Sequence, residues 1–185
     1  MVTKLRRINS SNTKYENTFC KLGLHNGESY KFESLEAIIV EINELKEHEK
    51  IDEQYCEQLK SRIQKDGFIK KAIAVDANTR IVLDGHHRLN ALRRLGCKRI
   101  PAILVDYNSP MIQVQGWNKD TVSKQAVIVA GTTPNKLPPK TTRHTVIING
   151  LSRHISYIEK NVNIPLSELK PKNYDAMLSK FVAKK

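Results

Sequence analysis

The stretch from residue 81 to residue 96 constrains the fold of this chain more than any other. It begins with an apolar run of strand type and continues as a helical pattern with leucines along one face. The break between the two patterns falls at Asp84-Gly85, and Gly96 follows as a helix stop. We therefore expect a strand, a tight turn and a helix in direct succession.

The turn itself is rich in groups that can bind an anion. The amino end of a helix offers unpaired N–H groups and the positive end of the helix dipole, which suit a phosphate. Glycine lets the backbone approach a ligand closely, and arginine adds a permanently charged, forked donor. These residues alone also fit a solvated connection that binds nothing. The turn residues are Asp84, Gly85, His86, His87 and Arg88.

Apolar periodicity divides the remainder into short strands and helices. Asp52 is a good helix N-cap, apolar residues recur at helical spacing after it, and Gly67 is the expected stop. Pro101 favours an edge or an entry position for its strand. We expect the strand at 72–75 to run antiparallel to the one at 81–83. The expected strands are 38–42, 72–75, 81–83, 100–107 and 111–114, and the expected helices are 52–66, 86–95 and 121–130, with one helical turn within 164–169.

These elements predict a mixed α/β fold of three parts. Residues 1–34 are polar and mixed, and we describe them as an N-terminal extension. Residues 35–107 form the predicted core. Residues 108–185 form a smaller C-terminal lobe, which contains an extended, basic, proline-containing segment at 135–144.

Composition narrows the class of partner. The 185 residues include 31 basic and 19 acidic ones, and the resulting net charge of +12 fits a phosphate-rich partner such as a nucleic acid, a nucleotide or a phosphorylated metabolite. The basic residues are dispersed, however, which is typical of a solvated surface. The three cysteines form no metal or disulfide pattern. With no leader pattern and no membrane-length apolar run, we expect a cytoplasmic protein with no membrane partner.

Three polar clusters, each at an expected element end, are candidates for chemistry: His48-Glu49, the turn at 84–88, and Lys140 to His144. Together they offer a carboxylate base, a metal-binding carboxylate and phosphate-binding donors, which is what phosphoryl transfer requires. Taken alone, Glu49 fits a solvated surface acid beside Lys46 and Lys50 better than a catalytic residue. The standard glycine-rich nucleotide loops and the protein-kinase motifs are absent from the sequence.

These motifs resemble those of the ParB/sulfiredoxin superfamily. The resemblance rests on residues 84–92, on 95–101 and on Val105-Asp-Tyr107. Within the superfamily the chain is most similar to the free L-serine kinases, which make O-phospho-L-serine for cysteine biosynthesis. His48-Glu49, Gly116-Trp117 and residues 137–144 fall where those kinases have further motifs. The resemblance implies a mixed sheet flanked by helices.

Two branches of the superfamily are disfavoured by the residues at the turn. Chromosome-partition ParB proteins carry a glutamate and two arginines after the glycine, where this chain has His86, His87 and Arg88. They also need a helix-turn-helix domain, for which we find no convincing segment. Sulfiredoxin needs a cysteine at the position of His86, and Cys97 lies on the wrong side of the helix motif.

The resemblance implies L-serine and a nucleotide as substrates, with Mg²⁺ as cofactor. ATP and ADP both stay open as the donor, and a monomer and a homodimer both stay open as the assembly. Despite the charge, nucleic acid is not the expected partner, although a ParB-like nucleotide- or DNA-binding regulator is the alternative function. The implied roles are catalysis for Glu49 and Asp84, Mg²⁺ binding for Asp84, nucleotide phosphate binding for Gly85, His86, His87 and Arg88, and substrate binding for His48, Trp117, Lys140, Thr142, Arg143 and His144.

Overall fold

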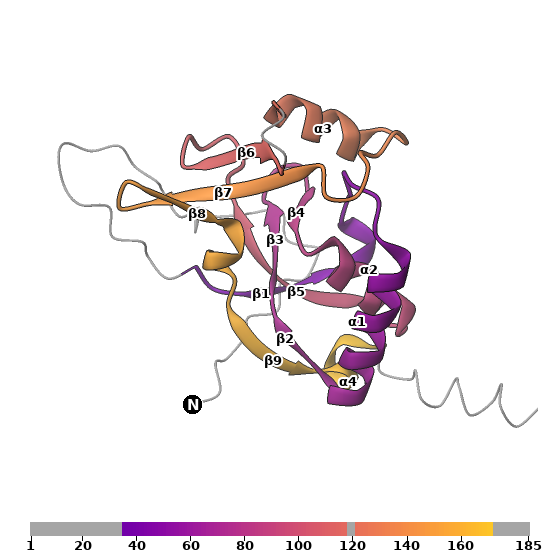
Figure 1. Ribbon diagram of the computed structural model, residues 1–185. Coiled ribbons are helices and arrows are strands. Elements are labelled where there is room, and N and C mark those ends of the chain that lie inside the picture. The colour runs from indigo at the N-terminus through magenta and orange to yellow at the C-terminus, as the bar shows by residue number, and fades with distance from the viewer. Residues whose placement is uncertain (1–34, 118–120, 172–185) are drawn as a thin grey trace, which may run out of the picture.

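The fold was analysed in a computed structural model that describes residues 35–117 and 121–171 (Figure 1). The helices are α1 (Glu53–Asp66), α2 (His86–Arg94), α3 (Lys124–Thr132) and α4 (Leu166–Leu169), with 3-10 turns η1 (Ile42–Glu44) and η2 (Ile155–Ile158). The strands are β1 (Ile38–Glu41), β2 (Phe68–Lys71), β3 (Ile73–Asp76), β4 (Val82–Asp84), β5 (Arg99–Val105), β6 (Ile112–Gly116), β7 (Thr142–Ile148), β8 (Leu151–His154) and β9 (Asn161–Pro165). The predicted extension at 1–34 lies outside the described residues.

A four-stranded mixed sheet in the order β1-β5-β3-β4 lies at the centre. Strands β3 and β5 are parallel, whereas β3 and β4 are antiparallel, as the sequence predicted. Side chains alternate across a strand, so Ile73 and Val75 face one hydrophobic cluster while Ala74 faces the other. The central strand is therefore buried on both faces.

Helices α1 and α2 pack against each other and cover one face of this sheet (Figure 1). The side chain of Asp52 accepts a hydrogen bond from the backbone N–H of Tyr55 and caps α1. Gly67 ends the helix in the left-handed conformation at φ 77°. Both predicted signals of this helix are confirmed.

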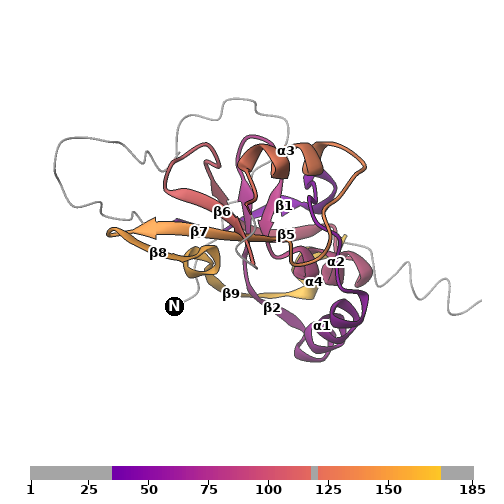
Figure 2. The same cartoon turned by 45° about the horizontal axis from the view of Figure 1, so that its top comes forward.

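The other face of the sheet is covered by α3 and a three-stranded antiparallel sheet in the order β6-β7-β8 (Figure 2). Val127 of α3, Ile112 of β6 and Val146 of β7 are buried there. The predicted strand near 111–114 and the predicted helix near 121–130 are confirmed, with shifted ends.

The C-terminal segment returns to the first half of the chain. Strand β9 pairs antiparallel with β2, and Ile164 and Leu169 join the cluster that contains α1 and α2. Figure 1 shows β9 and α4 beside β2, at the lower end of α1. The division at residue 107 into a core and a lobe stays a prediction, and contacts across that boundary are extensive.

Strand β5 corrects one detail of the sequence analysis. It has neighbours on both sides, so an edge position for Pro101 is wrong. Pro101 faces Ile39 of β1, and the pairing with β3 begins one residue later, at Ala102. The proline thus lies just before the pairing with β3 begins. A residue at this position does not need an N–H for a hydrogen bond to β3.

Candidate active site

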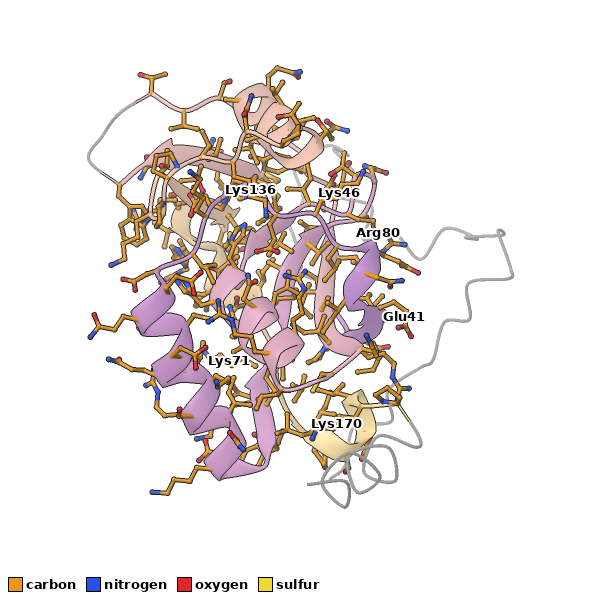
Figure 3. The ribbon with its side chains drawn as sticks, turned by 90° about the vertical axis from the view of Figure 1, so that its right-hand side faces the viewer. Glu41, Lys46, Lys71, Arg80, Lys136 and Lys170 are labelled. Atoms are coloured by element: carbon orange, nitrogen blue, oxygen red, sulfur yellow. The ribbon has the colours of Figure 1, made fainter. Side chains whose placement is uncertain are left out.

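The short segment before α1 carries the first polar cluster into the interior. Its Lys46 is hydrogen-bonded through the backbone to Arg80, at 3.0 Å, and the two lie at the same end of the molecule (Figure 3). Two further backbone bonds tie the segment to Leu137, from Lys50 N–H at 2.9 Å and to the His48 carbonyl at 2.8 Å. The segment is therefore fixed between the entry to β4 and the chain that leads to β7.

His48 is fully buried at 0% exposure. Its Nδ1 lies 2.9 Å from the carbonyl oxygen of Val82, and its Nε2 lies 2.9 Å from Oγ1 of Thr142. Burial lowers the pKa of His48 to about 4, although the bond to Val82 opposes the shift. The side chain is therefore neutral at ordinary pH.

Glu49 lies beside His48 and is 8% exposed, so the alternative of a solvated surface acid is wrong. Its Oε1 accepts a hydrogen bond from the backbone N–H of Thr142, at 2.5 Å, and is also bonded to the Thr142 hydroxyl. Burial raises the pKa of Glu49, and the nearby Asp84 carboxylate adds to the rise, while the bonds from Thr142 oppose it. Such a carboxyl binds a proton more readily than an ordinary glutamate, as a general base requires.

Two more histidines surround His48. The ring of His86 lies 4.6 Å from that of His48, and the ring of His144 lies 5.5 Å away, both edge-on. Nε2 of His144 is hydrogen-bonded to the Tyr107 hydroxyl at 2.9 Å. Burial lowers the pKa of His86 and lowers that of His144 to about 3. The three rings form a neutral, buried cluster, and Nε2 of His48 lies 3.9 Å from Oε1 of Glu49.

The turn between β4 and α2 has the geometry that the sequence predicted. Gly85 has φ 104°, and a Cβ on it would lie 2.4 Å from Cγ2 of Ile73. Glycine is therefore required both by the backbone angle and by the packing against β3. Gly85 is the N-cap of α2, and within the described residues no side-chain cap is bonded to the first N–H groups of this helix.

Arg88 is held by two carboxylates. Its Nη2 donates to Oδ2 of Asp84 at 2.7 Å, and both Nη atoms bond Glu159, while Nη1 also donates to the Ala72 carbonyl at 2.6 Å. Burial opposes ionisation of Asp84, yet the hydrogen bond with Glu159 and the charge of Arg88 hold its pKa below its usual value. Burial and the bond with Asp84 raise the pKa of Glu159 to about 8. The phosphate-binding role of Arg88 stays a prediction, with much of its donor capacity already used.

The other predicted site residues lie around this centre. Nε2 of His87 accepts a hydrogen bond from the backbone N–H of Asp52 at 3.0 Å, so this ring contacts the start of α1. The guanidinium of Arg143 lies 5.6 Å from the centre of the half-exposed Trp117 ring. Lys140 is exposed on the loop before β7, and its backbone bonds Glu49. The structure thus gathers His48, Glu49, His86, Thr142 and His144, and it places Trp117 and Arg143 together.

Glu159 and Tyr107 contact predicted site residues but were missed from the sequence. Glu159 is 71 residues from Arg88, and no local pattern marks it. Tyr107 was among the residues that carry the family resemblance, but it was given no role in the site. Its hydroxyl contacts His144, which lies 37 residues away in the sequence.

A magnesium ion fits this site only in part. Within the described ranges, no group of three or more histidine, cysteine, aspartate or glutamate side chains is arranged to hold a metal. Mg²⁺ commonly binds through one or two carboxylates, several waters and substrate phosphates. The ionised Asp84 at the amino end of α2 suits that mode, in which a phosphate would complete the set of ligands.

Comparison with known proteins decides the family. The family model of the ParB N-terminal domain matches residues 24–116, half of the chain. The chain belongs to this family. A ParB-like protein of Sulfolobus acidocaldarius is 51% identical over 47 residues, which are 25% of this chain and 24% of the relative. An ATP-dependent L-serine kinase of Staphylothermus marinus is 30% identical over 87 residues, 45% of this chain and 34% of the relative. An ADP-dependent L-serine kinase of Thermococcus kodakarensis is 27% identical over 84 residues, 43% of this chain and 35% of the relative.

Solved structures agree with the ParB-type fold. A free serine kinase in complex with AMP superposes with a TM-score of 0.61 at 15% identity, over 74% of this chain and 95% of that chain. The matched regions span between 24% and 35% of the length of these curated relatives. The superposition on the solved structure shows that the two chains share a fold. Among the helices in the described ranges, none has the length and apolarity needed to cross a membrane.

Proposed function

We propose that this ParB-family chain is a free L-serine kinase, which transfers the terminal phosphoryl group of a nucleotide to the serine hydroxyl. The observation that carries the proposal is Glu49, a buried carboxyl with a raised pKa, fixed by Thr142 and close enough to Asp84 to be affected by its charge. In this proposal Glu49 is the base and the amino end of α2 is the phosphate-binding element of the same site. The L-serine kinases among the relatives of this chain support the same function.

In this mechanism the chain positions its substrates and offsets charge, because phosphoryl transfer has a loose transition state. The uncapped amino end of α2, with Gly85 at its start, would bind the nucleotide phosphates. Glu49 would orient the serine hydroxyl and accept its proton. Arg143 and Trp117 would wall the serine site, with Lys140 and His144 nearby.

Mg²⁺, held by Asp84 and by the nucleotide phosphates, would supply charge neutralisation at the transferred group. The relatives include both ATP- and ADP-dependent kinases, and we favour ATP as the commoner donor. O-phospho-L-serine would then serve cysteine biosynthesis in the cytoplasm. The enzyme would act as a monomer or a homodimer.

A phosphorus NMR assay tests the function directly. Purified protein, Mg²⁺ and L-serine are incubated separately with ATP and with ADP. A phosphoserine signal is the expected result, and the tube in which it appears identifies the donor. Bound nucleotide without phosphoserine in either tube would refute the kinase assignment.

The alternative is a nucleotide- or DNA-binding regulator, favoured by the 51% identity to a ParB-like protein and by the net charge of +12. Binding to duplex DNA that weakens steeply with salt, with no phosphoserine formed, would support it. The buried Glu49 and its bonds to Thr142 favour the kinase, since DNA binding requires neither.

A further inference from the structure

The contacts of His48, Thr142 and Glu49 fix the number of hydrogens between them. A carbonyl oxygen can only accept, so the bond to Val82 requires a hydrogen on Nδ1 of His48. In a neutral imidazole the other nitrogen, Nε2, is then an acceptor. The contact between Nε2 and Oγ1 of Thr142 therefore needs the hydroxyl hydrogen of Thr142.

The same hydroxyl oxygen is also bonded to Oε1 of Glu49. Thr142 has a single hydroxyl hydrogen and cannot fill both contacts. If Glu49 is ionised and His48 is neutral, the Thr142 hydrogen can fill only one of its contacts with Glu49 and His48. The other contact would then place two hydrogen-bond acceptors against each other, with no hydrogen between them. With a proton on Glu49, the carboxyl donates to Thr142, Thr142 donates to His48, and both contacts are satisfied. The observed geometry therefore matches the state that follows proton transfer, in which Glu49 carries one additional proton.

The surroundings favour placing this proton on Glu49. Burial raises the pKa of Glu49 and lowers that of His48. The ionisable groups that face the pair are Glu47 on the same segment, Asp84 and His86 at the turn, and His144 in β7; the Lys140 backbone also bonds Glu49. His86 and His144 are neutral, and Asp84 adds negative charge, so this setting disfavours an ionised Glu49.

We propose that His48 and Thr142 form a hydrogen-bond relay behind Glu49. When Glu49 takes the proton of the acceptor hydroxyl, every donor and acceptor in this relay is paired. The proposal rests on the kinase function and deepens it. The serine oxygen bonds to the terminal phosphorus, and the bond from that phosphorus to the nucleotide's bridging oxygen breaks, its electron pair leaving with the nucleotide. The serine proton comes to rest on Oε1 of Glu49, and the Thr142 hydrogen turns from Glu49 to His48. Water removes the proton before the next turnover.

The relay changes the roles expected for two residues. The sequence analysis placed His48 and Thr142 in substrate binding, whereas their polar side-chain atoms are used within the relay. In the relay they are positioning residues, which act on serine through Glu49. Their loss should lower kcat and leave the KM for serine nearly unchanged.

Nuclear magnetic resonance tests the relay without depending on activity. Histidine labelled with ¹⁵N and glutamate labelled with ¹³C report on Nε2 of His48 and on the Glu49 carboxyl, with His48→Gln used for assignment. We expect the two signals to change with pH together in the wild type. In Glu49→Gln the amide always supplies the second hydrogen, so the Nε2 signal should stay constant over that pH range. An Nε2 signal that still titrates in Glu49→Gln would overturn the relay.

Thr142→Val and Thr142→Ser form the matched pair. Valine keeps the β-branched shape in β7 but lacks the hydroxyl, whereas serine keeps it. Thr142→Val should uncouple the two signals and lower kcat about tenfold, less than the loss expected on removing the base itself. Thr142→Ser should retain both the coupling of the two signals and the wild-type kcat. A raised KM at normal kcat in Thr142→Val would instead show that Thr142 binds substrate, and would refute the relay.

Failure of the relay and failure of the kinase function are distinguishable. If the wild type forms no phosphoserine, the kinase function fails, while the coupled signals still report on the relay. If phosphoserine forms and the signals titrate independently, the relay alone fails. Should Thr142→Val not fold, the Glu49→Gln spectra still decide, because an Nε2 signal that titrates in that variant overturns the relay and a constant one supports it.

Discussion

Glu49 shows how burial converts an ordinary surface residue type into a candidate base. The side chain lies in a charged stretch of sequence, yet the backbone bonds of its segment to Leu137 turn it inward. There it meets Thr142, 93 residues away, and loses most of its contact with water. The raised pKa follows from this position rather than from any neighbour in sequence.

The first prediction concerns this carboxyl. Glu49→Gln keeps the size of the side chain and removes its ability to accept a proton, so turnover should fall by about 10²–10⁴, the usual contribution of a general base. Nucleotide affinity should be unchanged, because the amino end of α2 is untouched. Phosphoserine formation and nucleotide titration measure the two effects, and exposed Glu44→Gln is the control. Near-normal turnover in Glu49→Gln would remove Glu49 from the mechanism.

Gly85 gives a second prediction at the same scale. An alanine there must adopt φ 104° and push against Ile73 of β3, whereas Gly67 shares the positive φ, at 77°, with nothing within 4 Å of an added Cβ. Gly67→Ala should therefore cost roughly 1–2 kcal/mol from the backbone alone. Gly85→Ala should cost about 1–3 kcal/mol more, from overpacking. Denaturant unfolding measures both, and equal losses would show that the contact with Ile73 is relieved without cost.

Among the elements, the strand, turn and helix from β4 to α2 could be predicted from sequence because every signal in them is local. The N-cap and glycine stop of α1 were equally local. Strands β2, β7, β8 and β9 were not predicted. Strand β2 pairs with a partner about ninety residues away, and short strands of mixed polarity become strands through such pairing. The turn residues of the site were found by their type, whereas Glu159 required the fold to bring it to Arg88.

At the scale of the whole molecule, the C-terminal segment is part of the same hydrophobic core as α1 and α2. Leu169 of α4 is fully buried, at 0% exposure, and Lys98 donates a backbone bond to its carbonyl at 2.9 Å. A core made of residues 35–107 alone would expose this surface. The two predicted parts should therefore unfold together.

This cooperation gives the third prediction. Leu169→Ala should destabilise the whole molecule by about 2–5 kcal/mol, as deletion of a buried leucine side chain does. Leu151→Ala, at a leucine that is 58% exposed in β8, should change stability by about 0.5 kcal/mol or less. Urea unfolding followed by both circular dichroism and Trp117 fluorescence measures the changes. Separate transitions in the two signals would show that the lobe is independent.

The buried histidines give the fourth prediction. His48 and His144 have pKa values of about 4 and about 3 when folded, against 6.5 in the unfolded chain. Between these values the unfolded chain binds more protons, so their contribution to stability is full above pH 6.5 and is lost as the pH falls. Each should contribute a slope of up to about 1.4 kcal/mol per pH unit. In His144→Gln, the slope measured by unfolding at a series of pH values should fall by up to about 1.4 kcal/mol per pH unit; an unchanged slope would contradict a neutral, buried His144.

The two carboxylates around Arg88 have a consequence for synthesis of the protein. During translation the turn at 84–88 leaves the ribosome well before Glu159 and the strand that follows it. Until then Arg88 lacks its bidentate partner, and β2 lacks the strand that covers its edge. A nascent chain would thus present the turn at 84–88 without the bonds from Glu159 that hold Arg88. Emergence of Glu159 and β9, rather than arrival of the turn, would set the moment at which Arg88 is held in place.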